Sequence, residues 1–258
     1  MQTFQVLDTP IGLLTMPMAI GAVAQWLEEE GRCKLVTFAN VHMVVEARLQ
    51  PEFGNILRQM DLNCPDGRPL SWIGGVLHGE KVSQVAGPDF MPLFCQETAG
   101  QGHRHFLYGG GDGIAEKAAR ELMRRYPGIQ IAGHYSPPFR QLTREEDEQV
   151  CARINQSGAD IVWVGLGCPK QEQWILDHRE MLNVKVVLAV GQAFDLLAGV
   201  RTRAPKVFRR LGMEWAYRLL QEPGRLWKRY LITNALFITW MLPSLLRSEI
   251  RVNRSIET

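Results

Sequence analysis

The chain has 258 residues, of which 46% are hydrophobic and 22% charged, and its formal net charge is +2. This length and composition indicate a globular protein with one large core or two modest ones, and the nearly balanced charge gives no global reason to expect nucleic acid as a partner. The five cysteines are odd in number and lack Cys-x-x-Cys spacing, which argues against a disulfide framework and a structural zinc site. A reducing cytoplasm fits best, because the start of the chain is unlike a secretory leader.

The first third of the chain alternates strand-like and helix-like segments. Phe4–Leu7 and Gly12–Leu14 predict short strands or a hairpin, and Met18–Glu30 has the periodicity of a helix. Lys34–Asn40 then predicts a buried strand that ends in polar residues.

Helical periodicity returns in Val44–Leu49 and Phe53–Met60, and the polar segment Asp61–Gly67 breaks it. In a parallel sheet, the polar residues near Asn40 and Asp66 would both lie at the carboxyl ends of neighbouring strands. Open α/β sheets bind their ligands at that edge.

The middle of the chain repeats this scheme. A strand at His105–Tyr108 leads through the glycine-rich turn Gly109–Gly113, which is typical of phosphate binding, into a helix at Ile114–Tyr126. The next strand, Gly128–Gly133, is followed by a proline-containing rigid loop at His134–Phe139. A capping box at Thr143–Glu146 then starts another helix.

The segment Ile161–Asp177 combines a buried strand, a glycine turn and a helix that begins near Gln171. Such a junction directs backbone N–H groups, the helix dipole and here Lys170 toward one point, where an anion is favoured. The motif alone is equally compatible with a tight turn between a strand and a helix. A further apolar strand, Val184–Val190, completes an α/β pattern of the Rossmann-like, doubly wound type with a mostly parallel sheet.

Beyond Gly199 the chain becomes rich in arginine, lysine and aromatic residues, and Leu231–Leu246 is almost wholly apolar. That run is shorter than the roughly 20 apolar residues that a membrane span needs, and Pro243 interrupts it. A basic, aromatic helix followed by an apolar one is typical of attachment to an anionic membrane surface. The alternative is a pair of helices packed on the domain or against a second subunit, with solvated or ligand-binding arginines.

Several motifs in this order resemble the WecG/TagA/CpsF glycosyltransferase family from about Thr37 to Tyr230. They are Thr37–Asn40, Pro65–Gly67, Val85–Asp89, Gly165–Glu172, Gly191–Asp195 with Gly199, Arg203–Pro205, and the tail from Glu214 to Tyr230. The resemblance implies a bacterial, inverting glycosyltransferase of the fold called GT-E. Its substrates would be a UDP-sugar donor and a polyprenyl-diphosphate-linked sugar acceptor, and its products intermediates of wall teichoic acid, enterobacterial common antigen or exopolysaccharide.

The resemblance also implies roles for individual residues. Asp66 is expected to be the general base, Thr37 and Asn40 to line the acceptor and reaction centre, and Gln171 to contact the diphosphate or the transferred sugar. A carboxylate suits the first role, although a Pro-Asp-Gly turn by itself also uses aspartate for backbone hydrogen bonds. The residues expected to bind the UDP-sugar are Gly109, Gly110, Tyr135, Gly167, Pro169, Lys170, Gly191 and Asp195.

The change of composition after Gly199, together with the resemblance, divides the chain into a catalytic core at 1–200 and a C-terminal appendage at 201–258. The appendage is expected to close over the active site and to hold the enzyme at the inner face of the plasma membrane. Its phosphate- or acceptor-binding arginines would be Arg203, Arg218, Arg225 and Arg229. One departure is Gln84, where relatives often have arginine, so that a charge contact is either missing or supplied by Lys81.

No cofactor or metal is expected. The sequence contains no Asp-x-Asp motif, and its six histidines show no ligand spacing, so backbone N–H groups and arginines would stabilise the leaving diphosphate. The residues by themselves are also compatible with two other classes of protein: a nicotinamide-dependent oxidoreductase and a non-catalytic, membrane-associated nucleotide-sugar-binding protein. The first is disfavoured because neither glycine turn has Gly-x-Gly-x-x-Gly followed by an acidic residue.

Overall fold

The protein is described by a computed structural model that covers residues 1–78, 81–210 and 212–254, without the side chains of Lys206, Arg210, Arg225, Arg229 and 244–254. The strands are β1 Thr3–Val6, β2 Thr9–Gly12, β3 Lys34–Ala39, β4 Leu62–Pro65, β5 Arg104–Gly109, β6 Gln130–Tyr135, β7 Ile161–Gly165 and β8 Val186–Ala189. The helices are α1 Met16–Glu28, α2 Val41–Leu49, α3 Pro51–Arg58, α4 Arg68–His78, α5 Gly87–Thr98, α6 Ile114–Arg125, α7 Arg144–Ser157, α8 Lys170–Asp177, α9 Ala193–Leu197, α10 Lys206–Arg210, α11 Glu214–Gln221 and α12 Pro223–Arg254.

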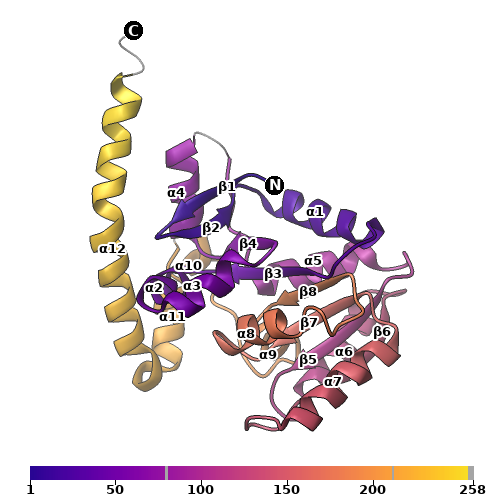
Figure 1. Ribbon diagram of the computed structural model, residues 1–258. Helices are drawn as coiled ribbons and strands as arrows, with labels where there is room; N and C mark the ends of the chain where they lie inside the picture. The colour runs from indigo at the N-terminus through magenta and orange to yellow at the C-terminus, as the bar shows by residue number, and fades with distance from the viewer. Residues whose placement is uncertain (79–80, 211, 255–258) are drawn as a thin grey trace.

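A six-stranded parallel sheet in the order β4-β3-β8-β7-β5-β6 forms the centre of the molecule (Figure 1). Helices cover both of its faces, and the β1–β2 hairpin lies beside it as a separate antiparallel pair. The central strands β7 and β8 are apolar along their length because both of their faces are covered. This arrangement confirms the predicted doubly wound α/β class.

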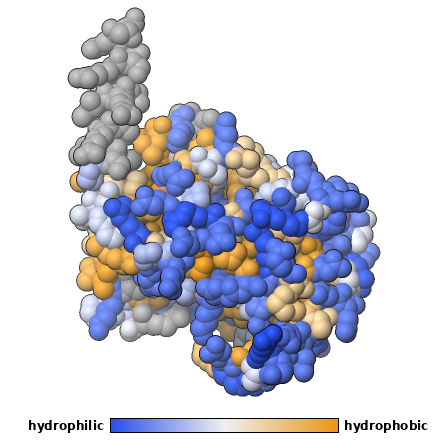
Figure 2. Space-filling model, in the orientation of Figure 1, coloured by the Kyte–Doolittle hydropathy of each residue, from blue (hydrophilic) through white to orange (hydrophobic). Residues whose placement is uncertain are grey.

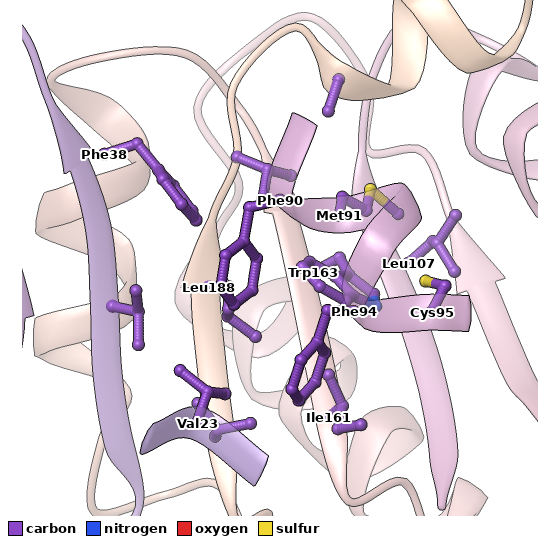
Figure 3. Packing of buried hydrophobic residues seen from close by; sticks show 14 of the residues in the cluster. Val23, Phe38, Phe90, Met91, Phe94, Cys95, Leu107, Ile161, Trp163 and Leu188 are labelled. Atoms are coloured by element: carbon purple, nitrogen blue, oxygen red, sulfur yellow. The ribbon is translucent and has the colours of Figure 1, made fainter. Parts of the chain in front are cut away.

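One face of the sheet is covered by α1, α5, α6 and α9, whose apolar side chains form a single cluster with the strands. Figure 3 shows Phe90 and Phe94 of α5 lying against Trp163 of β7. Their ring centroids are 6.4 and 6.0 Å from the Trp163 ring, and the Trp163 indole donates to His105 Nδ1 at 3.1 Å. Burial lowers the pKa of His105 to about 3, so this ring is neutral and accepts that hydrogen bond.

The opposite face is covered by α2, α3, α7 and α8. A third cluster joins the hairpin, α2 and α4 to α12, from which Phe237 and Met241 are buried. The long helix α12 therefore packs on the core along one side, next to α2 (Figure 1).

The structure corrects several local predictions. The second strand of the hairpin is Thr9–Gly12 instead of Gly12–Leu14. The segment Leu62–Pro65 is not a loop but the edge strand β4, because the Asn63 amide donates to Pro10 O and Leu57 O and because a proline is tolerated at an edge. The strand predicted at Gly128–Gly133 is displaced to Gln130–Tyr135, where it pairs with β5.

The apolar run near the C-terminus is not a separate helix. It continues α12, which starts at Pro223 and passes through Pro243. Among the helices of the described residues, none combines the length and the apolar character needed to cross a bilayer.

Candidate active site

Polar residues follow the carboxyl ends of β3 and β4 at one edge of the sheet. Asp66 comes directly after β4, and its backbone N–H donates to Ala39 O at the end of β3, at 2.7 Å. Further along the chain, after α4, the Val85 backbone N–H donates to Pro65 O at 2.9 Å. These bonds fix the Pro-Asp-Gly turn beside the start of α2.

The Asp66 carboxyl is held in an environment that favours its protonated form. Its pKa is raised to about 7, chiefly by burial and next by Glu214, while Arg218 and Arg203 oppose the shift and Asp89 adds to it. Glu214 and Arg218 belong to α11, so the appendage lies close enough to Asp66 to influence its ionisation. A carboxylate with a pKa near neutral is suited to general-base work.

The glycine junctions lie at the same edge as Asp66. From β4 to β7 the sheet crosses β3 and β8, and with about 4.8 Å between strands the span is roughly 14 Å. The chain continues from β3 to α2 on one face and from β8 to α9 on the other. Ligand crevices form where successive connections diverge in this way.

Gln171 joins the glycine junctions after β7 and β8. Its Oε1 accepts from Gly167 N at 3.2 Å and from Gly191 N at 3.1 Å, and its Nε2 donates to Glu172 Oε1 at 2.8 Å and to Ala189 O at 3.3 Å. The side chain is buried, and in this arrangement its amide makes four hydrogen bonds within the protein. Gln171 therefore ties the two glycine junctions together and satisfies both of their backbone N–H groups within the protein.

Thr37 faces the same group of side chains from β3. It is fully buried, and its hydroxyl donates to Glu172 Oε1 at 3.1 Å. Glu172 is also fully buried, and burial raises its pKa, which the hydrogen bonds from Gln171 and Thr37 partly offset. The other carboxyl oxygen of Glu172, Oε2, is buried. The Cys168 thiol lies close to this carboxyl and opposes the rise in its pKa.

The glycines after β5 allow a close approach of two chain segments. A Cβ on Gly109 would lie 2.6 Å from the Gly165 backbone, and its φ of +123° is one that side-chain-bearing residues rarely adopt. Gly110 N donates to Gly165 O at 2.9 Å. Ser136 completes this corner, because its hydroxyl donates to Gly109 O and accepts from Ala115 N.

The other predicted substrate-binding residues surround these junctions. Tyr135 ends β6, stacks on Tyr108 and lies under the Arg153 guanidinium at 5.1 Å. Pro169 and Lys170 start α8, with Lys170 Nζ over the Phe139 ring. Asp195 lies in α9 and pairs with Arg201 at 3.3 Å.

Asn40 caps α2, and its side chain accepts from Met43 N at 3.2 Å. This capping bond explains why the chain turns sharply into a helix after β3. The residue lies next to Ala39, which binds the Asp66 turn. The structure therefore brings Asn40 and Asp66 together.

The appendage is attached to the core by ion pairs. Arg203 makes a bidentate pair with Asp89, with Nη2 to Oδ2 at 2.6 Å, and lies 3.7 Å from Glu214. Arg201 pairs with Asp195 of the core and, within the appendage, with Glu222 at 2.5 Å. The predicted roles of Arg225 and Arg229 fall on side chains outside the described residues.

A hollow of about 410 Å³ lies between α5, α9 and the start of the appendage. Its lining includes Asp89, Leu93, Arg125, Leu196, Arg201 and Arg203. Volumes of this size are within the range of small-molecule sites. In the part of the chain that the structure covers, no group of three or more His, Cys, Asp or Glu side chains is arranged to hold a metal ion.

An open parallel sheet that gathers glycine turns and a carboxyl with a near-neutral pKa at its carboxyl edge is the arrangement of a ligand-binding α/β protein. The model of the glycosyl transferase WecG/TagA/CpsF family matches residues 4–251. The chain belongs to this glycosyltransferase family.

Two relatives carry the name N-acetylglucosaminyldiphosphoundecaprenol N-acetyl-beta-D-mannosaminyltransferase. The protein from Bacillus spizizenii is 30% identical over 203 residues, which cover 79% of this chain and 77% of that protein. The protein from Staphylococcus aureus is 32% identical over 195 residues, which cover 75% of this chain and 73% of that protein.

Three polar residues at this edge received no role from the sequence. Glu172 and Asp89 stood inside recognised motifs, and Ser136 stood in a loop predicted only to be rigid. For Glu172 a signal existed, because it neighbours Gln171, Trp174 and Ile175 on the buried side of α8. Asp89 resembled an ordinary acidic residue in the first turn of a helix.

Proposed function

We propose that the enzyme transfers an N-acetylmannosamine-type sugar from a UDP donor to undecaprenyl-diphosphate-linked N-acetylglucosamine, in the synthesis of a bacterial cell-surface polymer. The names of the two relatives support both the sugar and the acceptor. The observation that carries the proposal is the position of Asp66, at the same sheet edge as the glycine junctions and with a pKa near neutral.

In the proposed reaction, an acceptor hydroxyl oxygen attacks the anomeric carbon from the face opposite UDP. The new bond forms between that oxygen and the anomeric carbon, the bond to the UDP oxygen breaks, and UDP leaves with the electron pair. Asp66 takes the proton of the attacking hydroxyl. Inversion at the anomeric carbon follows from this geometry.

The leaving diphosphate gains negative charge in this step. We assign its stabilisation to Lys170 at the start of α8 and to Arg218 of α11, beside the junctions that Gly167 and Gly191 form. Gln171 and Thr37 hold this edge of the site through Glu172. The nucleotide is assigned to the neighbouring corner formed by Gly109, Gly110, Tyr135, Pro169, Lys170 and Asp195.

We assign residues 1–200 to catalysis and the appendage (201–258) to closure and membrane attachment. One side of α12 is buried on the core, while Trp227, Leu231, Ile238 and Leu242 are exposed. Their spacing places them on a common side of the helix, and Figure 2 shows hydrophobic surface along the edge where α12 lies. With the neighbouring basic residues, this surface is suited to peripheral attachment to the anionic inner leaflet.

The catalytic proposal is tested by UDP release in a panel of UDP-sugars with a short-chain prenyl-diphosphate-linked N-acetylglucosamine. We expect release with UDP-N-acetylmannosamine and a β-linked disaccharide product by NMR. Asp66→Asn should lose this activity, while Asp8→Asn, at another turn aspartate, should retain it. No acceptor-dependent release with any donor of the panel would overturn the proposal.

The membrane proposal is tested by co-sedimentation with vesicles of phosphatidylglycerol and phosphatidylethanolamine. Leu231→Glu together with Ile238→Glu should abolish binding, whereas Met123→Glu, an exposed apolar position on α6, should leave it unchanged. Unaltered vesicle binding by the double variant would contradict the assignment. A dimer that dissociates in the double variant would instead place a second subunit on this surface.

A further inference from the structure

Asp89 is the carboxylate on which the start of the appendage converges. It lies in the first turn of α5 and accepts from both Nη atoms of Arg203, a residue 114 positions later in the chain. Arg209 Nη1 lies 3.6 Å from the same carboxylate. A carboxylate shared by two arginines, one of them bidentate, is geometrically more restricted than an ordinary surface ion pair.

These contacts lead from the core to α11. Arg203 connects Asp89 to Glu214, the first residue of α11, at 3.7 Å. Glu214 and Arg218 of α11 then both act on the ionisation of Asp66. The contacts that begin at Asp89 thus continue along the appendage to the surroundings of the Asp66 carboxyl.

We propose that Asp89 is the docking anchor of the appendage, a positioning residue whose ion pairs with Arg203 and Arg209 hold α11 over the catalytic edge. The inference deepens the proposed function and rests on it, since it names the contact that closes the site. It assigns Arg203 to docking, in place of the phosphate- or acceptor-binding role that the family resemblance implies. Arg218 then remains as the described appendage arginine available to the diphosphate.

The first test measures docking without activity. Chymotrypsin can cleave the full-length protein at Phe208, Trp215 or Tyr217, and these sites are unchanged by the substitutions. We expect Asp89→Asn and Arg203→Gln each to accelerate first cleavage there at least about 10-fold. The double variant should be no faster than the faster single variant, because both remove the same contact. Glu121→Gln, an acidic residue paired with two arginines on α6, is the matched control and should cleave at the wild-type rate.

The second test uses the pH dependence of kcat/KM for sugar transfer. The charged groups facing Asp66 are Glu214 and Arg218 from α11, Arg203 before α10, and Asp89 from α5. Loss of the Arg203 charge alone would raise the pKa of Asp66 and move the acidic limb to higher pH, whereas loss of the Asp89 charge alone would lower that pKa. The Arg203 variant therefore separates release of α11 from a direct charge effect. Release of α11 would let water reach Asp66, and burial is the largest cause of its raised pKa, so the limb should move to lower pH.

We therefore expect Asp89→Asn and Arg203→Gln both to shift the limb downward, with kcat/KM reduced at least about 10-fold at its plateau. Asp89→Glu should restore much of the wild-type cleavage rate. Wild-type cleavage rates in both single variants, or an upward shift in Arg203→Gln, would overturn the anchor. If wild-type enzyme lacks transfer activity, the proposed function fails, and the cleavage rates still decide whether Asp89 docks the appendage.

Discussion

Replacing Asp66 by asparagine should make the protein more stable and less active. Asparagine keeps the size and the turn-forming ability of aspartate but has no charge and no basicity. The wild-type pKa of about 7 differs from the unfolded value of 3.8 by about three, which corresponds to about 4 kcal/mol. Because the side chain is only half-buried, solvent screening reduces the expected difference to about 2 kcal/mol.

The pH dependence gives this prediction a definite sign. Folding raises the pKa of Asp66, so its contribution to stability is full below the unfolded pKa of 3.8 and is lost as the pH rises through about 7. The unfolding free energy of Asp66→Asn should therefore exceed that of wild type by an amount that grows between about pH 4 and 7 and then levels off.

The assays are urea denaturation across this pH range and thermal unfolding near pH 8, where we expect a rise in Tm of roughly 4–8 °C. Turnover in the same preparation should fall about 100- to 10,000-fold with loss of the general base. Wild-type turnover and unchanged stability in Asp66→Asn would refute the reasoning and leave Asp66 as a turn residue only.

Three further substitutions, two of them with a matched control, test the packing of the sheet and of the site. Arg179→Ala should cost about 1–3 kcal/mol in denaturant unfolding, because Asp61 loses its buried partner and keeps only the exposed Arg32 and the Leu35 backbone N–H as close donors, whereas Arg120→Ala on exposed α6 should cost less than about 1 kcal/mol. Gly109→Ala should destabilise by at least about 2 kcal/mol through its contact with the neighbouring strand, while Gly21→Ala, an uncrowded helix position, should stabilise by about 0.5–1 kcal/mol. Thr37→Val should cost about 1–3 kcal/mol because the buried Glu172 carboxyl on α8 loses one of its two side-chain donors to Oε1, and an unfolding free energy equal to wild type would contradict that role.

The fold was largely predictable from local patterns. Continuous apolar runs such as Ile161–Val164 identify strands buried on both faces, and the glycine turns after them mark the ligand-binding edge. The edge strand β4 was not predictable in this way, because Leu62–Pro65 contains asparagine and proline and depends on bonds from the Asn63 side chain to Pro10 and Leu57. Edge strands have a weaker pattern of apolar residues in the sequence than central strands have.

The chemistry of the site was less predictable from the sequence, because it depends on contacts between distant parts of the chain. The family motif identifies Asp66, but its pKa is determined by burial and by Glu214 and Arg218 of the appendage. Likewise, Asp89 and Arg203 each stand in a recognised motif, and only the fold shows that they bind each other. Sequence spacing indicates which residues matter, whereas ionisation follows from the environment that packing creates.

The central claim is that Asp66 removes the proton from the acceptor hydroxyl during transfer from a UDP-sugar. The most direct measurement is the pH profile of kcat/KM for transfer from UDP-N-acetylmannosamine to prenyl-diphosphate-linked N-acetylglucosamine, in wild type and Asp66→Asn. We predict that wild-type kcat/KM rises with pH to a plateau above an apparent pKa of about 7, and that this limb is lost in the variant. The same limb in both proteins, or a variant with wild-type rates, would contradict the account.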